Sequence, residues 1–395
     1  MIEHASRAQR NERTLYMERD EAVSLMMKLL KLMLKEGGSD LFITAGFPPA
    51  MKLKGKMTPM MKKPLTPNDS QMMTQAIMND KQLKEFEDTK ECNFAIAPPG
   101  VGRFRVNAFV QQTYQGMILR AIETTVPNFD KLGLPPILKE VITAKNGLIV
   151  MVGGTGSGKS TTMAAMIDHR NASSYGHIIT LEDPIEYVHP HKKCVVTQRE
   201  IGTDTDSWEA ALHNTLRQAP DVILLGEIRD AEIMNFGLEF AQTGHLAMAT
   251  LHANNANQAV DRILGFFETE KQKKLMQDIS LNLRAIISQR LIRTVDGGRC
   301  AAIEILLNSP LIAELIATGD IAGIKPIMAK SSELGMQTFD QALFAFHEQD
   351  KISMEEALKN ADSANELKLK IKLEGKGAGG LSTGGLTLED KEEED

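Results

Sequence analysis

Cysteine and aromatic residues are scarce in this sequence. Its 395 residues include 3 cysteines and 1 tryptophan, and only 5% of them are aromatic. Cys92, Cys194 and Cys300 lie about a hundred residues apart and form no C-x-x-C pair. This spacing argues against a zinc ribbon, a thiol redox motif and a disulfide framework. We therefore expect three reduced cysteines that pack inside the protein.

Long apolar runs and a secretory leader are also missing. No apolar stretch approaches the ~18–20 residues that a bilayer-spanning helix needs. Near the start of the chain Arg7, Arg10 and Arg13 are interleaved with glutamates, and no apolar segment with a cleavage site follows. The sequence therefore predicts neither a signal peptide nor a transmembrane segment, and we expect a cytosolic protein.

A basic excess is absent as well. The formal net charge is −7, and the last seven residues hold six acids and one lysine, which account for −5. The rest of the chain therefore carries −2, the difference between the two values. A nearly neutral body argues against nucleic acid as the partner. The remaining composition, 42% hydrophobic and 25% charged, is typical of a soluble globular protein, and the length allows two or three domains.

The first third of the chain has the pattern of a small α+β domain, which we predict over residues 21–120. Residues 1–20 are polar and irregular, and we interpret them as a flexible lead-in. Apolar residues recur at helical spacing in two segments, and alternating segments predict strands. The expected elements are helices over 21–35 and 71–86, strands over 40–44 and 51–54, and a hairpin of strands over 104–110 and 116–122.

A turn-rich segment with several prolines, residues 121–136, predicts an interdomain linker. Beyond it, over 137–374, short apolar runs alternate with helical patterns, which predicts a mainly parallel sheet flanked by helices. The glycine-rich and acidic residues 375–395 are interpreted as a disordered tail. The expected elements are strands over 148–152, 178–181, 222–225 and 246–251, and helices over 270–289 and 340–348.

A glycine-rich motif follows the first of these strands. Residues 153–161 match G-x-x-x-x-G-K-[ST] between a strand and a helix. Such glycines let backbone N–H groups and a helix N-terminus point at one phosphate chain. Lys159 is expected to reach the β- and γ-phosphates and the Ser160 hydroxyl to ligate Mg²⁺. The predicted nucleotide-binding residues are Gly153, Gly154, Thr155, Gly156, Ser157, Gly158, Lys159, Ser160 and Thr161.

A second apolar run ends in an acid. Residues 221–227 read Asp-Val-Ile-Leu-Leu-Gly-Glu, which puts Glu227 in the Walker B position. Gly226 stands where many NTPases have the aspartate that holds Mg²⁺. Two roles stay open for Glu227, because it can steer the attacking water or belong to the outer shell of the metal. A glutamate at a strand end is by itself most often a solvated terminus, but its place after a phosphate loop favours catalysis.

Three carboxylates, Glu182, Asp183 and Glu186, follow another predicted strand. Parallel-sheet proteins bind ligands at such carboxyl ends. Pro184 keeps Asp183 extended, which displays the acids from a turn. The spacing alone is equally compatible with a solvated loop and with a site.

These motifs together resemble the type II/IV secretion ATPase superfamily, and more closely its pilus retraction ATPases, the PilT/PilU family. The phosphate loop is followed in order by an Asp box at 179–188, by the segment 216–230 with Gly-Glu-Ile-Arg-Asp, and by a His box at 243–252. The resemblance covers about residues 21–370 and includes Ile287-Ser288-Gln289.

This resemblance implies a ring hexamer whose subunits each have a PAS-like N-terminal domain and a RecA-like ATPase domain. It implies that ATP and Mg²⁺ are the cofactors and that arginines of the N-terminal domain reach the nucleotide. Arg105 and Arg120 match that role, with Arg103 as a further candidate, since a guanidinium stays charged and suits phosphate. His245 and His252 match family residues that sense the γ-phosphate or pass its state to the subunit interface.

The resemblance also implies partners and a location. The ring would dock peripherally, from the cytoplasm, on an inner-membrane platform protein at the pilus base, together with a PilT paralogue. Assembly and secretion members carry a four-cysteine zinc module and an additional N-terminal domain. This chain has three scattered cysteines and no room for both features, so a retraction protein is favoured. Residues 311–317 lack two arginines that PilT sequences have, and segments 42–46 and 251–258 look more like the PilU branch.

The leading interpretation is an Mg²⁺-dependent ATPase motor that powers or assists pilus retraction and twitching motility. ATP binds the phosphate loop, Glu227 and the Asp box prepare water, and Arg105 and Arg120 compensate charge. Hydrolysis then changes the angle between the two domains. Two alternatives stay open, a nucleotide-binding accessory subunit that depends on a PilT paralogue and, with less support, a nucleic-acid translocase.

Overall fold

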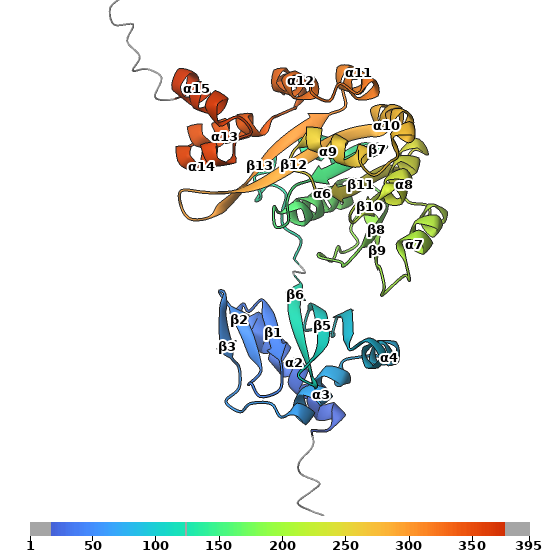
Figure 1. Ribbon diagram of the computed structural model, residues 1–395, viewed down its shortest axis with the longest axis vertical. Coiled ribbons are helices and arrows are strands. Elements are labelled where there is room, and N and C mark those ends of the chain that lie inside the picture. Colours follow the sequence, from blue (N-terminus) through green and yellow to red (C-terminus); the bar gives the residue numbers. More distant parts are fainter. Residues whose placement is uncertain (1–16, 123–124, 376–395) are drawn as a thin grey trace, which may run out of the picture. The chain divides into compact units, whose positions relative to one another are not determined.

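The structure is a computed structural model that describes residues 17–122 and 125–375 and divides into two compact units (Figure 1). The first unit holds the described residues up to Thr125 together with Ile185–Val188 and Gly202–Asp206, and the second holds the remainder. The predicted tail beyond residue 375 and most of the predicted lead-in lie outside the described residues.

The first unit is a six-stranded antiparallel sheet with helices on one face. Its strand order is β3-β2-β1-β6-β5-β4, and β5 and β6 form the expected hairpin, with Arg105 opposite Arg120. Alternate residues of β5, Phe104, Val106 and Ala108, are buried in the core, so the other set faces away from it. The elements are α2 (Arg19–Glu36), β1 (Asp40–Ile43), β2 (Ala50–Leu53), β3 (Lys56–Pro59), α3 (Pro67–Ala76), α4 (Asp80–Thr89), β4 (Glu91–Ile96), β5 (Arg103–Gln111) and β6 (Tyr114–Ile122).

Two boundaries in this unit differ from the sequence prediction. Helix α2 begins at Arg19, two residues before the expected start, and ends at Gly37 in the left-handed conformation (φ 75°), as expected. The single helix expected over 71–86 is two helices, because Asn79 accepts a hydrogen bond from the Gln82 N–H and caps a new helix, α4.

The second unit contains a seven-stranded sheet covered by helices on both faces. Its elements are α5 (Ile137–Thr143), β7 (Gly147–Val152), α6 (Lys159–Ser173), β8 (Gly176–Glu182), β9 (Cys194–Glu200), α7 (Trp208–Thr215), β10 (Val222–Leu225), α8 (Ala231–Gln242), β11 (Leu246–Leu251), α9 (Ala256–Leu264), α10 (Thr269–Asn282), β12 (Leu283–Arg293), β13 (Arg299–Leu307), α11 (Pro310–Thr318), α12 (Ile324–Lys330), α13 (Phe339–Glu348), α14 (Met354–Asn360) and α15 (Ala364–Glu374), with 3₁₀ turns at Leu216–Gln218 and Ser332–Leu334.

The strand order of this sheet is β13-β12-β7-β11-β10-β8-β9. All neighbouring pairs are parallel except β12 and β13. The predicted fold class, an α/β protein with a small α+β domain and a mainly parallel RecA-like sheet, is therefore confirmed. Because the parallel strands point the same way, their carboxyl ends share one edge, and the glycine-rich loop leaves β7 at that edge.

The helix expected over 270–289 is wrong in its second half. Helix α10 ends at Asn282, and the chain continues directly as strand β12, which pairs with β7 on one side and β13 on the other. Residues Ala285 to Gln289 are fully or almost fully buried, and a short, buried apolar run has no periodicity that separates a strand from a helix.

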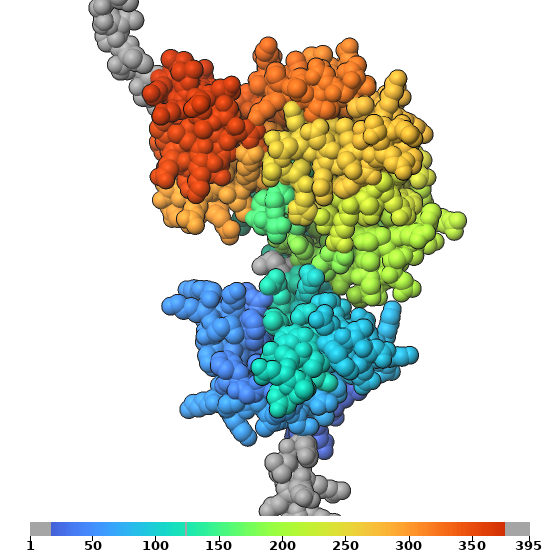
Figure 2. Space-filling model, in the orientation of Figure 1, coloured from blue at the N-terminus to red at the C-terminus, as the bar shows by residue number. Residues whose placement is uncertain are grey.

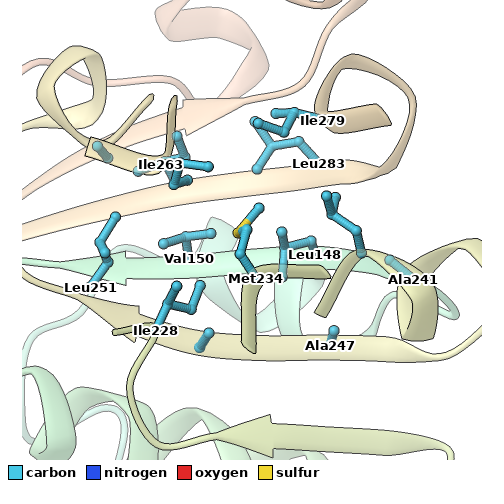
Figure 3. Close-up of a cluster of buried hydrophobic side chains, with 14 of the residues drawn as sticks. Leu148, Val150, Ile228, Met234, Ala241, Ala247, Leu251, Ile263, Ile279 and Leu283 are labelled. Carbon is cyan, nitrogen blue, oxygen red and sulfur yellow. The ribbon is translucent and has the colours of Figure 1, made fainter. Parts of the chain in front are cut away.

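The second sheet packs a core on each face. Along β7, Leu148, Val150 and Val152 belong to one core, whereas Ile149 and Met151 belong to the other. Figure 3 shows the first core, in which Leu148 and Val150 lie beside Met234 of α8 and Ile263 of α9. Such two-sided burial explains why the strands of this sheet are continuous apolar runs.

Helices α13–α15 form a lobe of their own over the end of the β12–β13 hairpin, drawn in red in Figure 2. Arg290 of β12 joins this lobe to the sheet. Its guanidinium donates to the Asn360 carbonyl (2.6 Å) and to Asp362 (2.7 Å), and it lies 3.9 Å from the centre of the Phe339 ring.

Cys92, Cys194 and Cys300 are buried free thiols, as predicted. Across the described ranges, 17–122 and 125–375, no helix is long and apolar enough to cross a bilayer.

Candidate active site

The glycine-rich loop joins the buried strand β7 to helix α6. Gly156 and Gly158 adopt left-handed conformations (φ 77° and 86°), and Gly158 occupies the cap position of the helix. Residues other than glycine adopt these angles only at an energetic cost. The loop therefore needs glycine at these positions to connect β7 to the first turn of α6. The result is a helix N-terminus open to an anion at the carboxyl edge of the sheet.

The side chain of Lys159 lies across this loop. Its ammonium donates to the Gly153 carbonyl (2.7 Å) and to the Gly154 carbonyl (3.1 Å). In this structure the two carbonyl oxygens are acceptors of the Lys159 ammonium. Phosphate oxygens are charged acceptors for the same kind of donor, and hydrogen bonds to charged acceptors are the stronger ones.

A cluster of charged side chains forms around Glu227, just after β10. One carboxylate oxygen of Glu227 lies 3.3 Å from the Arg229 Nε, and the other lies 3.1 Å from the His252 Nε2. Arg229 also reaches Asp183, with its Nη1 3.2 Å from Oδ2. Arg229 thus joins two of the residues predicted from sequence, Asp183 and Glu227, and the third, His252, joins the cluster through Glu227.

Arg229 is held in its charged form by this cluster. Burial disfavours the charge, but the hydrogen bond and charge of Glu227, with those of Asp183, raise the pKa of Arg229 above its ordinary value. The guanidinium therefore stays a cation and fixes the direction of the Glu227 carboxylate. Sequence reasoning did not assign Arg229 a role, although its place two residues after Glu227 puts both side chains on one side of an extended segment.

The backbone around Gly226 explains why no aspartate stands there. The Gly226 N–H donates to the Leu181 carbonyl (2.8 Å), and the Gly226 carbonyl accepts from the Thr250 hydroxyl (2.6 Å). A Cβ atom at this position would lie 3.1 Å from the Leu181 oxygen and 3.3 Å from the Glu182 Cα. The end of β8 thus occupies the space that a larger residue would need.

The other acids of the Asp box have different surroundings. Glu182 accepts hydrogen bonds from the Thr180 hydroxyl (2.6 Å) and from the Gln198 amide (3.2 Å) at the end of β8. Glu186 is exposed and belongs to the segment Ile185–Val188, which groups with the first unit.

The two predicted histidines lie at opposite edges of the sheet. His252 follows the carboxyl end of β11, whereas His245 precedes its first residue and bonds through Nδ1 to the Thr243 hydroxyl (3.0 Å) and the Phe240 carbonyl (3.2 Å). Seven residues of extended chain at about 3.3 Å each separate them by roughly 20 Å. The structure therefore does not bring His245 to the phosphate loop of its own chain.

The predicted arginines lie on the first unit. Arg105 of β5 and Arg120 of β6 are cross-strand partners, and Asp40 of β1 is opposite Arg120 on its other side. The Arg120 Nε bonds to Asp40 (2.8 Å), and this bond, with one from Ser39, outweighs burial and lowers the pKa of Asp40. Arg103 is two residues before Arg105 on the same face. Like charges directly opposite each other destabilise a sheet, and Asp40 offsets the charge of Arg120 in this pair.

A cavity of about 260 Å³ opens beside the phosphate loop. It is bounded by Gly153 and Gly154 of the loop and by residues that follow β11, namely His252, Ala253, Asn254, Gln258 and Arg262. Asn254, Gln258 and Arg262 were not singled out from sequence, because only the sheet order brings the end of β11 next to the end of β7.

A family model described as "Type II/IV secretion system protein" matches residues 17–357. The chain belongs to this family. It is 56% identical over 347 residues to a protein of Pseudomonas aeruginosa named "Type IV pilus ATPase PilU", covering 88% of this chain and 91% of that protein. It is 41% identical over 334 residues to the type IV pilus retraction ATPase PilT of the same organism, covering 85% of this chain and 97% of PilT.

A solved structure supports the same relationship for the fold. A crystal structure of the pilus retraction motor PilT with bound ADP matches with a TM-score of 0.82 and 40% identity, covering 87% of this chain and 98% of that one. The resemblance to the PilT/PilU family that the motifs indicated is therefore confirmed, with PilU the more similar of the two Pseudomonas proteins.

Proposed function

We propose that this chain is an ATP-hydrolysing motor that powers or assists type IV pilus retraction, and hence twitching motility. The observation that carries the proposal is the phosphate loop and the Glu227 cluster on one edge of the sheet, in a family whose similar members are named pilus ATPases. The high coverage of both chains supports extending the activity to the whole protein.

The chemistry follows from the positions of the side chains. The phosphates of ATP bind at the loop, and Lys159 exchanges the Gly153 and Gly154 carbonyls for phosphate oxygens. Glu227, aimed by Arg229 and His252, accepts a proton from the water whose oxygen attacks the γ-phosphorus while the bond to the bridging oxygen breaks. Phosphoryl transfer depends mainly on such positioning and on charge compensation.

The residues of the loop fit Mg²⁺, which neutralises charge on the β- and γ-phosphates. Within the described part of the chain, no group of three or more His, Cys, Asp or Glu side chains is arranged to hold a metal. This suits Mg²⁺, which keeps several waters and takes one or two protein ligands beside phosphate. Ser160 is the ligand we propose. Both oxygens of Glu227 already have partners, which suits a base or an outer-shell acid.

Other features extend the proposal to an assembly. The family resemblance supports a ring hexamer in which Arg105 and Arg120 compensate phosphate charge, in the same subunit or a neighbouring one. Hydrolysis would change the angle between the two domains, with residues 121–136 as the linker. The force would reach an inner-membrane platform protein from the cytoplasmic side. A PilT paralogue would act together with this chain.

A second function has one observation in its favour. Helix α11 (Pro310–Thr318) contains no basic residue, whereas PilT sequences have two arginines in the matching stretch. This favours a nucleotide-binding subunit that retracts pili only together with a PilT paralogue.

The test is steady-state ATP hydrolysis by the purified full chain. Lys159→Ala is the blank, and Lys145→Ala, an exposed lysine just before β7 at the opposite edge, is the matched control. Turnover that needs Lys159, survives Lys145→Ala and ignores single-stranded DNA supports the motor. Stimulation by DNA would favour a translocase. No turnover in a nucleotide-bound oligomer, restored only on adding a PilT paralogue, would favour the accessory subunit.

A further inference from the structure

Gln289 is a buried polar side chain that sequence reasoning left without a role. It lies on β12, beside β7, and is only 1% exposed. In the register of these strands Ser288 is opposite Val152, so Gln289 lies level with the first residue of the phosphate loop. A buried amide must find partners for both its oxygen and its nitrogen, or it costs stability.

Both partners of the Gln289 amide belong to the phosphate-binding segment. Its Nε2 donates to the Ser157 carbonyl inside the loop (2.7 Å), and its Oε1 accepts from the Thr162 hydroxyl in the first turn of α6 (2.7 Å). The Ser157 carbonyl can only accept, so the NH₂ group must face it and the oxygen must face Thr162. The amide is thus a clamp between the loop and its helix.

The glycines at the two ends of the loop are matched to this clamp. A Cβ atom at Gly153 would lie 2.6 Å from the Gln289 carbonyl oxygen, and one at Gly158 would lie 2.7 Å from Nε2. Both distances are shorter than any ordinary contact. The main chain and the side chain of Gln289 therefore pack against the two ends of the loop and leave room there only for glycine.

We propose that Gln289 is a positioning residue for the nucleotide, one that holds the phosphate loop in its binding shape before the nucleotide arrives. This inference rests on the proposed ATP site. Gln289 acts through Ser157 and Thr162 and lies behind the loop. Binding to a preformed loop avoids the entropy of ordering it, so loss of the clamp weakens nucleotide affinity.

The substitutions follow from the chemistry of the amide. Gln289→Met keeps the length and removes both hydrogen bonds. Gln289→Glu keeps the acceptor for Thr162 but sets a carboxylate against the Ser157 carbonyl. For two hydrogen bonds we expect the Kd for a fluorescent ATP analogue and the KM for ATP to rise about tenfold or more. We expect kcat at saturating ATP to change much less.

Thr162 and Gln337 supply the controls. Thr162→Val removes one half of the clamp and Thr162→Ser restores it, so the serine variant should bind like wild type. Adding Thr162→Val to Gln289→Met should weaken binding little further, because the two residues share one interaction. Gln337 also donates its amide to a strand carbonyl, that of Ile303 (2.7 Å), away from the loop. Gln337→Met should leave Kd unchanged.

The experiment measures nucleotide Kd, KM, kcat and thermal melting for the full chain and these variants, with Lys159→Ala as blank. A raised Kd in Gln289→Met but not in Gln337→Met supports the inference. Wild-type affinity in a folded Gln289→Met, or an equal loss in Gln337→Met, overturns it. If Gln289→Met does not fold, the Thr162 variants decide, and equal affinity of the Val and Ser variants overturns it. Wild type that fails to bind nucleotide would instead overturn the proposed function.

Discussion

Replacing Glu227 by glutamine separates the catalytic role of this residue from a structural one. The glutamine has nearly the same shape, and it can still accept from Arg229 while its NH₂ group faces His252. It cannot accept a proton from water at neutral pH. We therefore expect Glu227→Gln to bind ATP and to lose hydrolysis.

The expected effects of Glu227→Gln on stability and on the rate of hydrolysis differ greatly in size. The Glu227 carboxylate contacts two side chains that are largely exposed, Arg229 (47%) and His252 (48%). Such pairs contribute at most about 1 kcal/mol to stability. A positioned general base contributes roughly a hundredfold to ten-thousandfold in rate, which is about 3–5 kcal/mol of barrier. A large loss of kcat with a small change in melting temperature is the expected signature.

The assay is steady-state ATP hydrolysis with nucleotide titration and thermal melting. Asp230→Asn is the matched control, because Asp230 caps helix α8 by accepting from the Ile233 N–H (3.0 Å) and asparagine caps a helix as well. This control should hydrolyse ATP like wild type. The reasoning is refuted if Glu227→Gln hydrolyses ATP like wild type while Glu186→Gln does not.

Three further predictions concern packing and titration. Gly226→Asp, which introduces the usual Walker B aspartate, should lower both ATPase activity and melting temperature, because overpacking against the Leu181 carbonyl costs about 1–3 kcal/mol; wild-type turnover would contradict this. Burial lowers the pKa of His189 from 6.5 to about 4. As the pH falls, the unfolded chain therefore takes up a proton on this histidine before the folded protein does, and roughly 2 kcal/mol of stability should be lost between about pH 7.5 and about pH 5. Urea unfolding should then show that His189→Phe flattens this pH dependence, and an unchanged slope would argue against it. Burial would raise the pKa of Asp362, but Lys325 and Arg290 outweigh it and lower this pKa. The stabilisation from Asp362 should therefore be fully present above the pKa that this residue has in the unfolded chain, and it should be lost as the pH falls toward its pKa in the folded protein. Asp362→Asn should destabilise the protein by about 3 kcal/mol at neutral pH, measured as a fall in melting temperature.

Much of the site was readable from sequence because its parts are contiguous. The phosphate loop is one run of residues whose glycines set the backbone locally, so the motif and the expected roles of Lys159 and Ser160 could be stated without knowing the fold. Strands β7, β10 and β11 were predicted within a residue because each is a short apolar run bounded by turns or helices. Local conformation and local burial were enough for these elements.

The remaining features depend on which strands are neighbours. Gln289 reaches Ser157 across 132 residues of chain, and the segment that carries it was predicted as a helix, because a run buried on both faces has no polar side to reveal its period. Arg229 meets Asp183 only because β10 lies beside β8. His245 and His252, seven residues apart, are separated by the length of a strand.

The sequence by itself therefore determined the phosphate-loop motif, the family and the fold class, since these follow from residues that are adjacent in the chain. Only the tertiary structure decided which side chains contact Glu227, that the Gln289 amide bonds to the loop, and that His252 lies beside the loop whereas His245 does not. The physical reason is that hydrogen bonds and ion pairs act over about 3 Å, and sheet order alone brings those distant residues within that reach.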